Sequence, residues 1–571
     1  MRKILLPALA VAVLLATSRV VPAQAAQPES TGLKTVLTVS VSGFDAIKKD
    51  VQTIAQASGM DQLMMPFMML GPQGPAGIDT TKPWGAVVQT DGQKLRVFAF
   101  LPASDPKLML GFLKPLGEEN ASPEPDADGV YEIEVRGWEL VLAKKGDWVV
   151  LADDRQTLAN VPADPVPLLG GLNKSYAFAV RGSIKDIPAS NRDQVVGLIR
   201  SGVEMAQQAQ PDKAPGEQTI ARSMEEVDKL LNEIDSVLIG LAVEPQSKAI
   251  RLDVEMTAIE GTSTAAEYAL AAEAKSDLAG FYLPEAALSA LFAGTMPESD
   301  SAQLLEWIDA RNSEAMKDLD EQDLSDGEKK LAKQMLGDLI SVLRKTVAAG
   351  RIDVGLSVLA GADSLSLVGG GSVADAATLE KLLKQTVHLA IAEDPGVEQA
   401  VTLDAEEHQG VRLHTLSVPA EQLPTDDIPA MIVGDVLTAA VGFSDQHAYL
   451  AVGPKAIDKL KQAIDQSKAA AGQSLPPARV SLSLTAIGNI LGGLGAATDL
   501  DVPTEVLDAL AQAGPNDHLL ISSEAIPNGV RTRIELQPGV LKAIGTAAAA
   551  MSPFGAGPGG FPAPGGLPGQ P

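Results

Sequence analysis

Cysteine is absent from this chain of 571 residues. Without thiols there can be no disulfide framework, no thiol nucleophile, no cysteine-ligated zinc and no iron–sulfur cluster. The fold must therefore be stabilised by burial. A chain of this length is long enough for two to four domains with substantial cores.

Aromatic and basic side chains are also scarce. Phe, Trp and Tyr make up 4% of the residues, so cores must be built mainly from Ala, Val, Leu and Ile. Lys and Arg number 45 against 73 Asp and Glu, which gives a formal net charge of −28. This balance argues against binding to nucleic acid or to an anionic membrane surface, because both need clustered basic side chains. The simplest role of the charge is solubility through mutual repulsion.

Residues 1–25 have the composition of an export signal. Two basic residues open the segment, residues 4–17 form an apolar run that is short for a membrane span, and an A-x-A cleavage site ends at Ala25. We expect cleavage before Ala26 and a secreted or periplasmic mature protein with no integral membrane segment. Retention of the apolar run as an anchor is the alternative.

A unit of two strand-like runs followed by a helix recurs along the chain. Its clearest copy is at residues 236–274, where SVLIGLAVEP, the polar turn QSK and AIRLDVEMTA precede the helical TAAEYALAAEA. Much the same pattern returns at residues 85–116, 351–389 and 518–550. Alternating runs joined by short polar turns predict antiparallel hairpins.

The order of these units predicts an α+β protein with two pseudo-repeated halves, residues 32–278 and 279–550. Each half is expected to be an antiparallel sheet of meanders and hairpins with helices packed on one face. For example, DWVVLADDRQTLANV in the first half corresponds to HAYLAVGPKAIDKL in the second. Residues 552–571 are rich in Gly and Pro and have little to bury, which predicts a disordered tail.

Three local patterns give further expectations in the second half. Residues 285–293 (EAALSALFA) are expected to form a helix. Ser325 and Glu328 have the spacing of a capping box that begins a long helix. The run GGGS at 369–372 lacks the spacing of a phosphate-binding loop, so we expect a permissive turn that ends at a helix N-cap.

A methionine-rich segment at residues 60–74 (MDQLMMPFMMLGPQG) is the main candidate for binding an apolar ligand. Methionine is flexible and polarizable, so such a patch can adapt to different apolar shapes. Such a segment is more often a loosely packed core helix with a loop behind it, and this is the interpretation that we favour. The candidate ligand contacts are Met64, Met65, Phe67, Met68 and Met69.

The histidines give weak evidence for a metal site. His408 and His414 lie on successive predicted strands near Glu406 and Glu407, so they could in principle meet across a hairpin. A third ligand and the H-E-x-x-H spacing are both missing. We therefore expect surface or strand-end histidines and no bound metal.

Other patterns typical of metal-binding or catalytic sites are incomplete in this sequence. Residues 318–329 begin like a calcium loop, but Asp323 and Lys329 replace the required Gly and Glu, which favours an acidic turn between helices. The chain has no G-x-S-x-G elbow, and its adjacent acid pairs are sequence neighbours whose carboxylates usually point apart. The sequence therefore assigns no catalytic residue and no cofactor.

The export signal, the repeated strand–helix and hairpin–helix units, the lack of cysteine and the Gly/Pro tail together resemble a loose group of uncharacterised secreted bacterial proteins. That resemblance implies no activity. We expect a non-enzymatic structural or binding component of the periplasm or cell envelope, with an envelope protein or an apolar ligand as its partner. Two alternatives stay open: a carrier that uses the segment 60–70 for an apolar ligand, and a hydrolase with a dispersed site.

Overall fold

The structure is a computed structural model. It describes residues 32–70, 74–113, 124–135, 137–189, 191–192, 229, 231–322, 325–361, 364–422, 435–473, 475–497 and 502–550. The expected signal at 1–25 and the expected tail at 552–571 lie outside the described residues.

The strands are β1 (Lys34–Val41), β2 (Trp84–Thr90), β3 (Leu95–Leu101), β4 (Tyr131–Val135), β5 (Trp138–Lys145), β6 (Trp148–Ala152), β7 (Phe178–Ser183), β8 (Ile234–Val243), β9 (Ile250–Ala258), β10 (Leu288–Thr295), β11 (Arg351–Ala360), β12 (Leu365–Ser372), β13 (Val401–His408), β14 (Val411–Pro419), β15 (Val436–Phe443), β16 (His447–Val452), β17 (Ala478–Ser483), β18 (His518–Ile526) and β19 (Gly529–Leu536).

The α-helices are α2 (Phe44–Ser58), α3 (Met65–Met69), α4 (Pro106–Leu113), α5 (Arg155–Asn160), α6 (Leu172–Ser175), α9 (Ser263–Ala272), α10 (Glu298–Glu321), α11 (Asp326–Ala348), α12 (Ala376–Glu393), α13 (Val397–Ala400), α15 (Ala456–Ala469), α16 (Leu484–Ala497), α17 (Thr504–Ala511) and α18 (Pro538–Ala550). Short 3₁₀ turns are η1 (Asp61–Met64), η3 (Val166–Leu169), η5 (Ala279–Phe281) and η6 (Ala420–Gln422).

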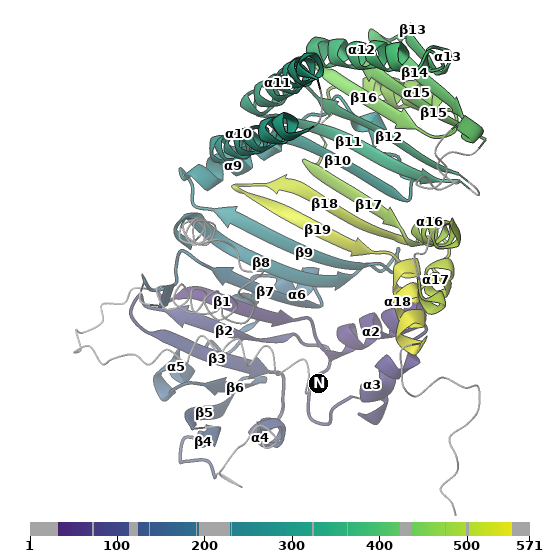
Figure 1. The fold of residues 1–571 in the computed structure, drawn as a ribbon. Coiled ribbons are helices and arrows are strands. Elements are labelled where there is room, and N and C mark those ends of the chain that lie inside the picture. The colour runs from purple at the N-terminus through teal and green to yellow at the C-terminus, as the bar shows by residue number, and fades with distance from the viewer. Residues whose placement is uncertain are drawn as a thin grey trace, which may run out of the picture.

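All the described strands join one 19-stranded antiparallel sheet. Its order is β4-β5-β6-β3-β2-β1-β7-β8-β9-β19-β18-β17-β10-β11-β12-β16-β15-β14-β13. Figure 1 shows α9–α12 beside one end of the strands and α2, α3 and α16–α18 beside the other. The expectation of a mixed α+β fold with an antiparallel sheet is confirmed, and β2–β3, β8–β9, β11–β12 and β18–β19 are the expected hairpins.

The first-half and second-half strands meet at the β9–β19 pair, where opposite charges face each other. Arg533 lies opposite Asp253, and Arg531 lies opposite Glu255. Asp253 is only 1% exposed; Arg533 Nε donates a hydrogen bond to it at 2.8 Å, and the Tyr176 hydroxyl donates another at 3.1 Å. Opposite charges directly across a pair favour this register over a one-residue slip.

Side chains on the second-half strands alternate between two faces of the sheet, and both faces have helices against them. On the face that we call the α15 face, Leu291, Val368 and Ala451 of the sheet pack with Leu460 and Ile464 of α15. Helices α11 and α12 oppose the other face, which we call the groove face. The expectation that helices pack on one face is therefore wrong. Many of these strands are apolar at consecutive positions, so both faces need cover.

Two local expectations for the second half are also wrong. Residues 288–295 form strand β10 in the middle of the sheet, although an Ala- and Leu-rich run was expected to be helical. The alternating side chains of Ser289, Leu291 and Ala293 are buried, and Ser289 hydrogen-bonds Ser357 on β11 at 2.7 Å. Tertiary pairing has overridden helix propensity here. The glycines at 369–371 belong to strand β12 and make no turn.

Candidate functional site

A cavity of about 750 Å³ lies between the groove face of β11, β12, β15 and β16 and the helices α11 and α12. Only Thr386 and Tyr449, among its lining residues, have polar side-chain atoms, and no lining residue is charged. The strand backbone beneath is paired within the sheet. The cavity can therefore hold an apolar ligand, whereas a charged group inside it would find no counter-charge.

Two glycines recess the floor of the cavity. Gly369 and Gly371 on β12 alternate with residues that face α15, so the groove face of this strand carries no side chain at these positions. A Cβ on Gly371 would meet only Val354 Cγ2, at 3.9 Å. The flanking Val354 and Leu450 remain 44% and 40% exposed, so the floor is apolar and incompletely covered.

The roof of the cavity is formed by one apolar stripe on each of two helices. Helix α11 contributes Met335, Leu336 and Leu339, and α12 contributes Leu379, Leu382 and Leu383. Spacings of three and four residues place each set on one side of its helix. These stripes lie over the floor without filling the space between.

The two roof helices are tied together and to the sheet by ion pairs. Lys345 of α11 pairs with Asp375, the N-cap residue of α12, at 2.5 Å. Arg412 of β14 donates two hydrogen bonds to Glu380 of α12 from Nε, at 3.2 and 2.9 Å, and a third from Nη2 at 2.5 Å. Polar contacts thus hold the roof at its margins while its centre stays apolar.

The apolar floor continues beyond the cavity along the whole middle of the sheet. Residues in register across antiparallel strands point to the same face. One such row, from β15 to β8, is Val441, Leu450, Gly369, Leu356, Ala290, Val480, Ile521, Ile534, Leu252 and Leu241. Phe292, Ile239 and Leu241 on the same face are 42%, 46% and 36% exposed. The cavity is the part of this longer apolar face that lies opposite α11 and α12.

A charged cluster bounds the groove face at β14. Arg412 and His414 are in register with the cavity-lining Phe443 and Val441, so they lie on the same face. The pKa of Glu380 is lowered to about 2, mainly by hydrogen bonds from Arg412 and further by Lys384. The groove face therefore changes from apolar to ionic at this strand, just outside the lining of the cavity.

His414 in this cluster is held in a state that disfavours metal binding. Its Nδ1 accepts a hydrogen bond from the backbone N–H of Asp404 at 2.9 Å, and burial lowers its pKa. The neutral ring must then carry its proton on Nε2, which lies 3.5 Å from Glu380 Oε1. Glu380, Asp404 and His414 have the proximity of metal ligands, but the lone pair of the histidine is already used.

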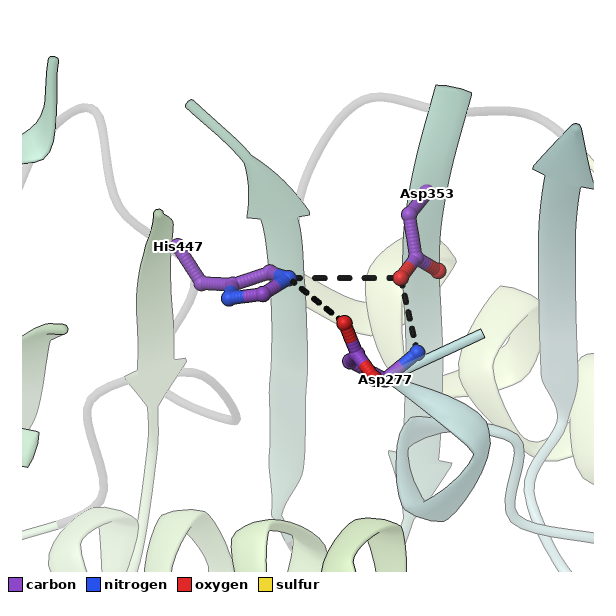
Figure 2. Close-up of side chains that lie close together, drawn as sticks. All are labelled: Asp277, Asp353 and His447. Atoms are coloured by element: carbon purple, nitrogen blue, oxygen red, sulfur yellow. Dashed lines mark hydrogen bonds and ion pairs between the residues drawn. The ribbon is translucent and has the colours of Figure 1, made fainter. Parts of the chain in front are cut away.

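A second cluster of this kind lies on the α15 face, and Figure 2 shows its members. Asp353 of β11 is fully buried and accepts hydrogen bonds from Ser276 Oγ at 2.6 Å, the backbone N–H of Asp277 at 2.8 Å and Arg351 Nη2 at 3.0 Å. Arg351 also contacts Asp277 Oδ2 at 2.6 Å. These bonds pin the turn before η5 onto the sheet.

His447 of β16 points into this second cluster without a hydrogen bond at Nε2. That atom lies 3.7 Å from Asp277 Oδ2 and 4.0 Å from Asp353 Oδ2, and the residue is 9% exposed. Burial lowers the pKa of His447, so its ring is neutral near pH 7. The site combines a neutral imidazole nitrogen with two carboxylates.

The residues singled out from the sequence lie elsewhere. Met65, Met68 and Met69 are 54%, 66% and 88% exposed on α3, and Phe67 packs 5.4 Å from the ring of Phe44. Met64 ends the adjoining turn η1. None of them lines the cavity, so ligand contact by this segment stays a prediction.

The two histidines considered as a metal pair do not meet. His408 lies on the α15 face, where its Nε2 is 2.8 Å from Asp465 Oδ1. His414 lies on the groove face, because its strand position has the opposite parity. Alternation of side chains along a strand separates them.

The sequence does not predict the cavity as a whole, although it predicts some of the elements that line it. The 3- and 4-residue spacing of Leu379, Leu382 and Leu383 predicts an apolar helix stripe, and consecutive apolar residues in β16 indicate a strand buried on both faces. The second cluster cannot be found from the sequence, because Asp277 lies in the turn before η5 whereas Asp353 and His447 lie on two different strands.

No family model, curated protein or solved structure matches this chain. In the part of the chain that the structure describes, no helix is both long enough and apolar enough to cross a bilayer. The geometry of the two sites is therefore the ground for inferring a function.

Proposed function

We propose that this protein is a binding protein for an apolar ligand such as an acyl chain, held between α11, α12 and the glycine-recessed floor of the sheet. The observation that carries this proposal is the cavity of about 750 Å³ with no charged residue in its lining. Pockets for small ligands typically span about 300–1,000 Å³ and are lined mainly by apolar side chains.

Two features favour an elongated ligand over a compact one. The cavity opens onto the apolar row that continues across the sheet to β8. Exposed aliphatic side chains along that row would be shielded by a chain-like ligand, and each methylene removed from water contributes about 0.8 kcal/mol.

The test is a substitution that fills the floor without disturbing the sheet. Gly371→Leu would place a branched side chain in the cavity, where the nearest neighbour of its Cβ is 3.9 Å away. Binding of dansyl-undecanoic acid, followed by its blue-shifted emission and by displacement with unlabelled palmitate, should weaken at least about tenfold.

Gly294→Leu is the matched control. Gly294 is also a strand glycine on the groove face, with no atom within 4 Å of a built Cβ, but it lies outside the cavity lining. This variant should bind the probe as the wild type does. Equal binding by wild type and Gly371→Leu, with both folded, would contradict the proposal.

We also propose that the mature protein acts outside the cytoplasm, in the periplasm or cell envelope. The support is the export-type composition of residues 1–25, with cleavage before Ala26. N-terminal sequencing of the exported protein tests this, and Met1 on a membrane-bound form would instead indicate a retained anchor.

A duplication of the chain, with copies at 32–278 and 279–550, is proposed as the origin of the architecture. The pairing order supports it: β4-β5-β6-β3-β2-β1-β7-β8-β9 reads like β14-β15-β16-β12-β11-β10-β17-β18-β19. On this reading, the cavity under the long helices α11 and α12 belongs to the second copy.

A further inference from the structure

One cluster outside the groove has a buried group with no partner. His447 is 9% exposed, its Nε2 makes no hydrogen bond, and the ring is directed at the carboxylates of Asp277 and Asp353 (Figure 2). A buried polar atom without a hydrogen-bond partner destabilises the fold unless another group or ion contacts it. An occupant is therefore expected between the ring and the carboxylates.

We propose that Asp277, Asp353 and His447 bind a divalent metal ion of the zinc class. One nitrogen and two oxygen donors, all within 4.8 Å of one another, make up the set. A tetrahedral ion with bonds of about 2.1 Å holds its donors about 3.4 Å apart. The present separations from His447 Nε2 to Asp277 and Asp353 are 3.7 and 4.0 Å, so each of these two gaps is within a few tenths of an ångström of the value in such a site.

The donor types select the class of ion. Imidazole nitrogen suits zinc and its transition-metal neighbours, whereas calcium and magnesium prefer an all-oxygen shell. The Asp277 side chain is 52% exposed, so the fourth position of a tetrahedral ion would face solvent. Three protein ligands and one open position resemble an exchangeable zinc site more than a closed structural one.

Arg351 is the competitor for the same oxygens. Its Nη2 lies 2.6 Å from Asp277 Oδ2 and 3.0 Å from Asp353 Oδ2, where it neutralises part of their charge. A bound divalent ion would repel the guanidinium, which is already 40% exposed and can turn toward water. Removing this arginine should therefore raise the affinity for the metal.

The groove-face cluster supplies an internal comparison. His414 has a similar arrangement of carboxylates, but its Nδ1 accepts the backbone N–H of Asp404, so its Nε2 holds a proton. Nε2 of His447 makes no hydrogen bond, so it is free to present its lone pair when the ring proton is on Nδ1. Only the second cluster is ready to ligate.

The experiment is calorimetric titration of the chelator-treated full mature chain with Zn²⁺, in excess Mg²⁺ to saturate exposed carboxylates. Wild type should show one saturable site. His447→Gln should weaken it at least about tenfold, Arg351→Gln should strengthen it severalfold, and His414→Gln should leave it unchanged. Co²⁺ should give a visible absorption band in wild type that His447→Gln removes.

Melting curves show whether each variant is folded, and Asp277→Asn, at a half-exposed position, replaces His447→Gln if that variant unfolds. No saturable Zn²⁺ site in wild type would overturn the proposal. So would equal affinities in wild type and His447→Gln, because such binding would come from general acidity alone.

Discussion

Protonation of Glu380 at low pH should weaken the attachment of α12, part of the roof of the groove, to the sheet. Its carboxylate has a pKa of about 2 in the folded protein, chiefly because Arg412 donates hydrogen bonds to it, against 4.5 for the free side chain. A lowered pKa means that this stabilisation is complete above about pH 4.5 and is lost as the pH falls toward 2.

Glu380→Gln should therefore flatten the acid dependence of the melting temperature between pH 4.5 and 2. At neutral pH the variant should lose about 1.5–3 kcal/mol, the usual contribution of a hydrogen bond to a charged group. Glu406→Gln, which removes a carboxylate paired with Lys461 on the α15 face, should follow the wild-type profile. Parallel profiles for wild type and Glu380→Gln would show that the Arg412 contact is not the cause.

At the residue scale, the sequence predicts a contact between two side chains only where the two residues are close together in the chain. The capping pair Ser325 and Glu328 is local, and it is confirmed by hydrogen bonds at 2.8 and 3.3 Å. Asp353 and His447 meet only because β11 and β16 flank β12. Nothing in the spacing of those residues indicates that meeting.

At the scale of elements, the start of α11 should control how firmly the roof is held. Ser325 accepts from the backbone of Glu328, and the Glu328 carboxylate accepts from the backbone of Ser325. Ser325→Ala should cost about 1 kcal/mol and raise hydrogen exchange in the first turn of α11.

Ser313→Ala in α10 is its control. That hydroxyl only bonds the carbonyl of Asp309 one turn back, and alanine has the better helix propensity, so stability should be unchanged or slightly raised. An equal loss of stability in both variants would contradict a specific contribution of the cap at Ser325.

Hairpins and long helices were the elements most predictable from the sequence, because their patterns are local. The strand β10 was not, since residues 285–293 have the composition of a helix and become a strand only between β11 and β17. The glycines 369–371 likewise have the composition of a turn. Their place in β12 is set by packing, with Gly370 against the ring of Tyr449.

At the scale of the whole molecule, the β9–β19 pair is what makes one sheet from two sets of strands. Asp253 and Arg533 lie 280 residues apart in sequence, so no local pattern could pair them. Asp253→Ala removes a buried carboxylate that accepts hydrogen bonds from Arg533, whose side chain is 31% exposed, and from Tyr176. The variant should therefore cost about 1.5–3 kcal/mol.

The double variant Asp253→Ala with Arg533→Ala should lose less than the sum of the single losses, by about 1–3 kcal/mol. Urea unfolding gives these values, and Glu524→Ala, at a side chain 44% exposed beside Arg531, should cost at most about 1 kcal/mol. Additive losses would mean that the pair does not act as a unit across the seam.

The sheet is open, and its two outermost described strands, β4 and β13, each have one partner. An unpaired strand edge is a template for adding further strands from another copy, which leads to fibres. Both edges are acidic, with Glu132 and Glu134 on β4 and Glu406 and Glu407 on β13. Asp404 adds a left-handed φ of 50° within a break in the β13 register. The surplus of negative charge thus also limits polymerisation: it makes the ends of a very long sheet repel one another.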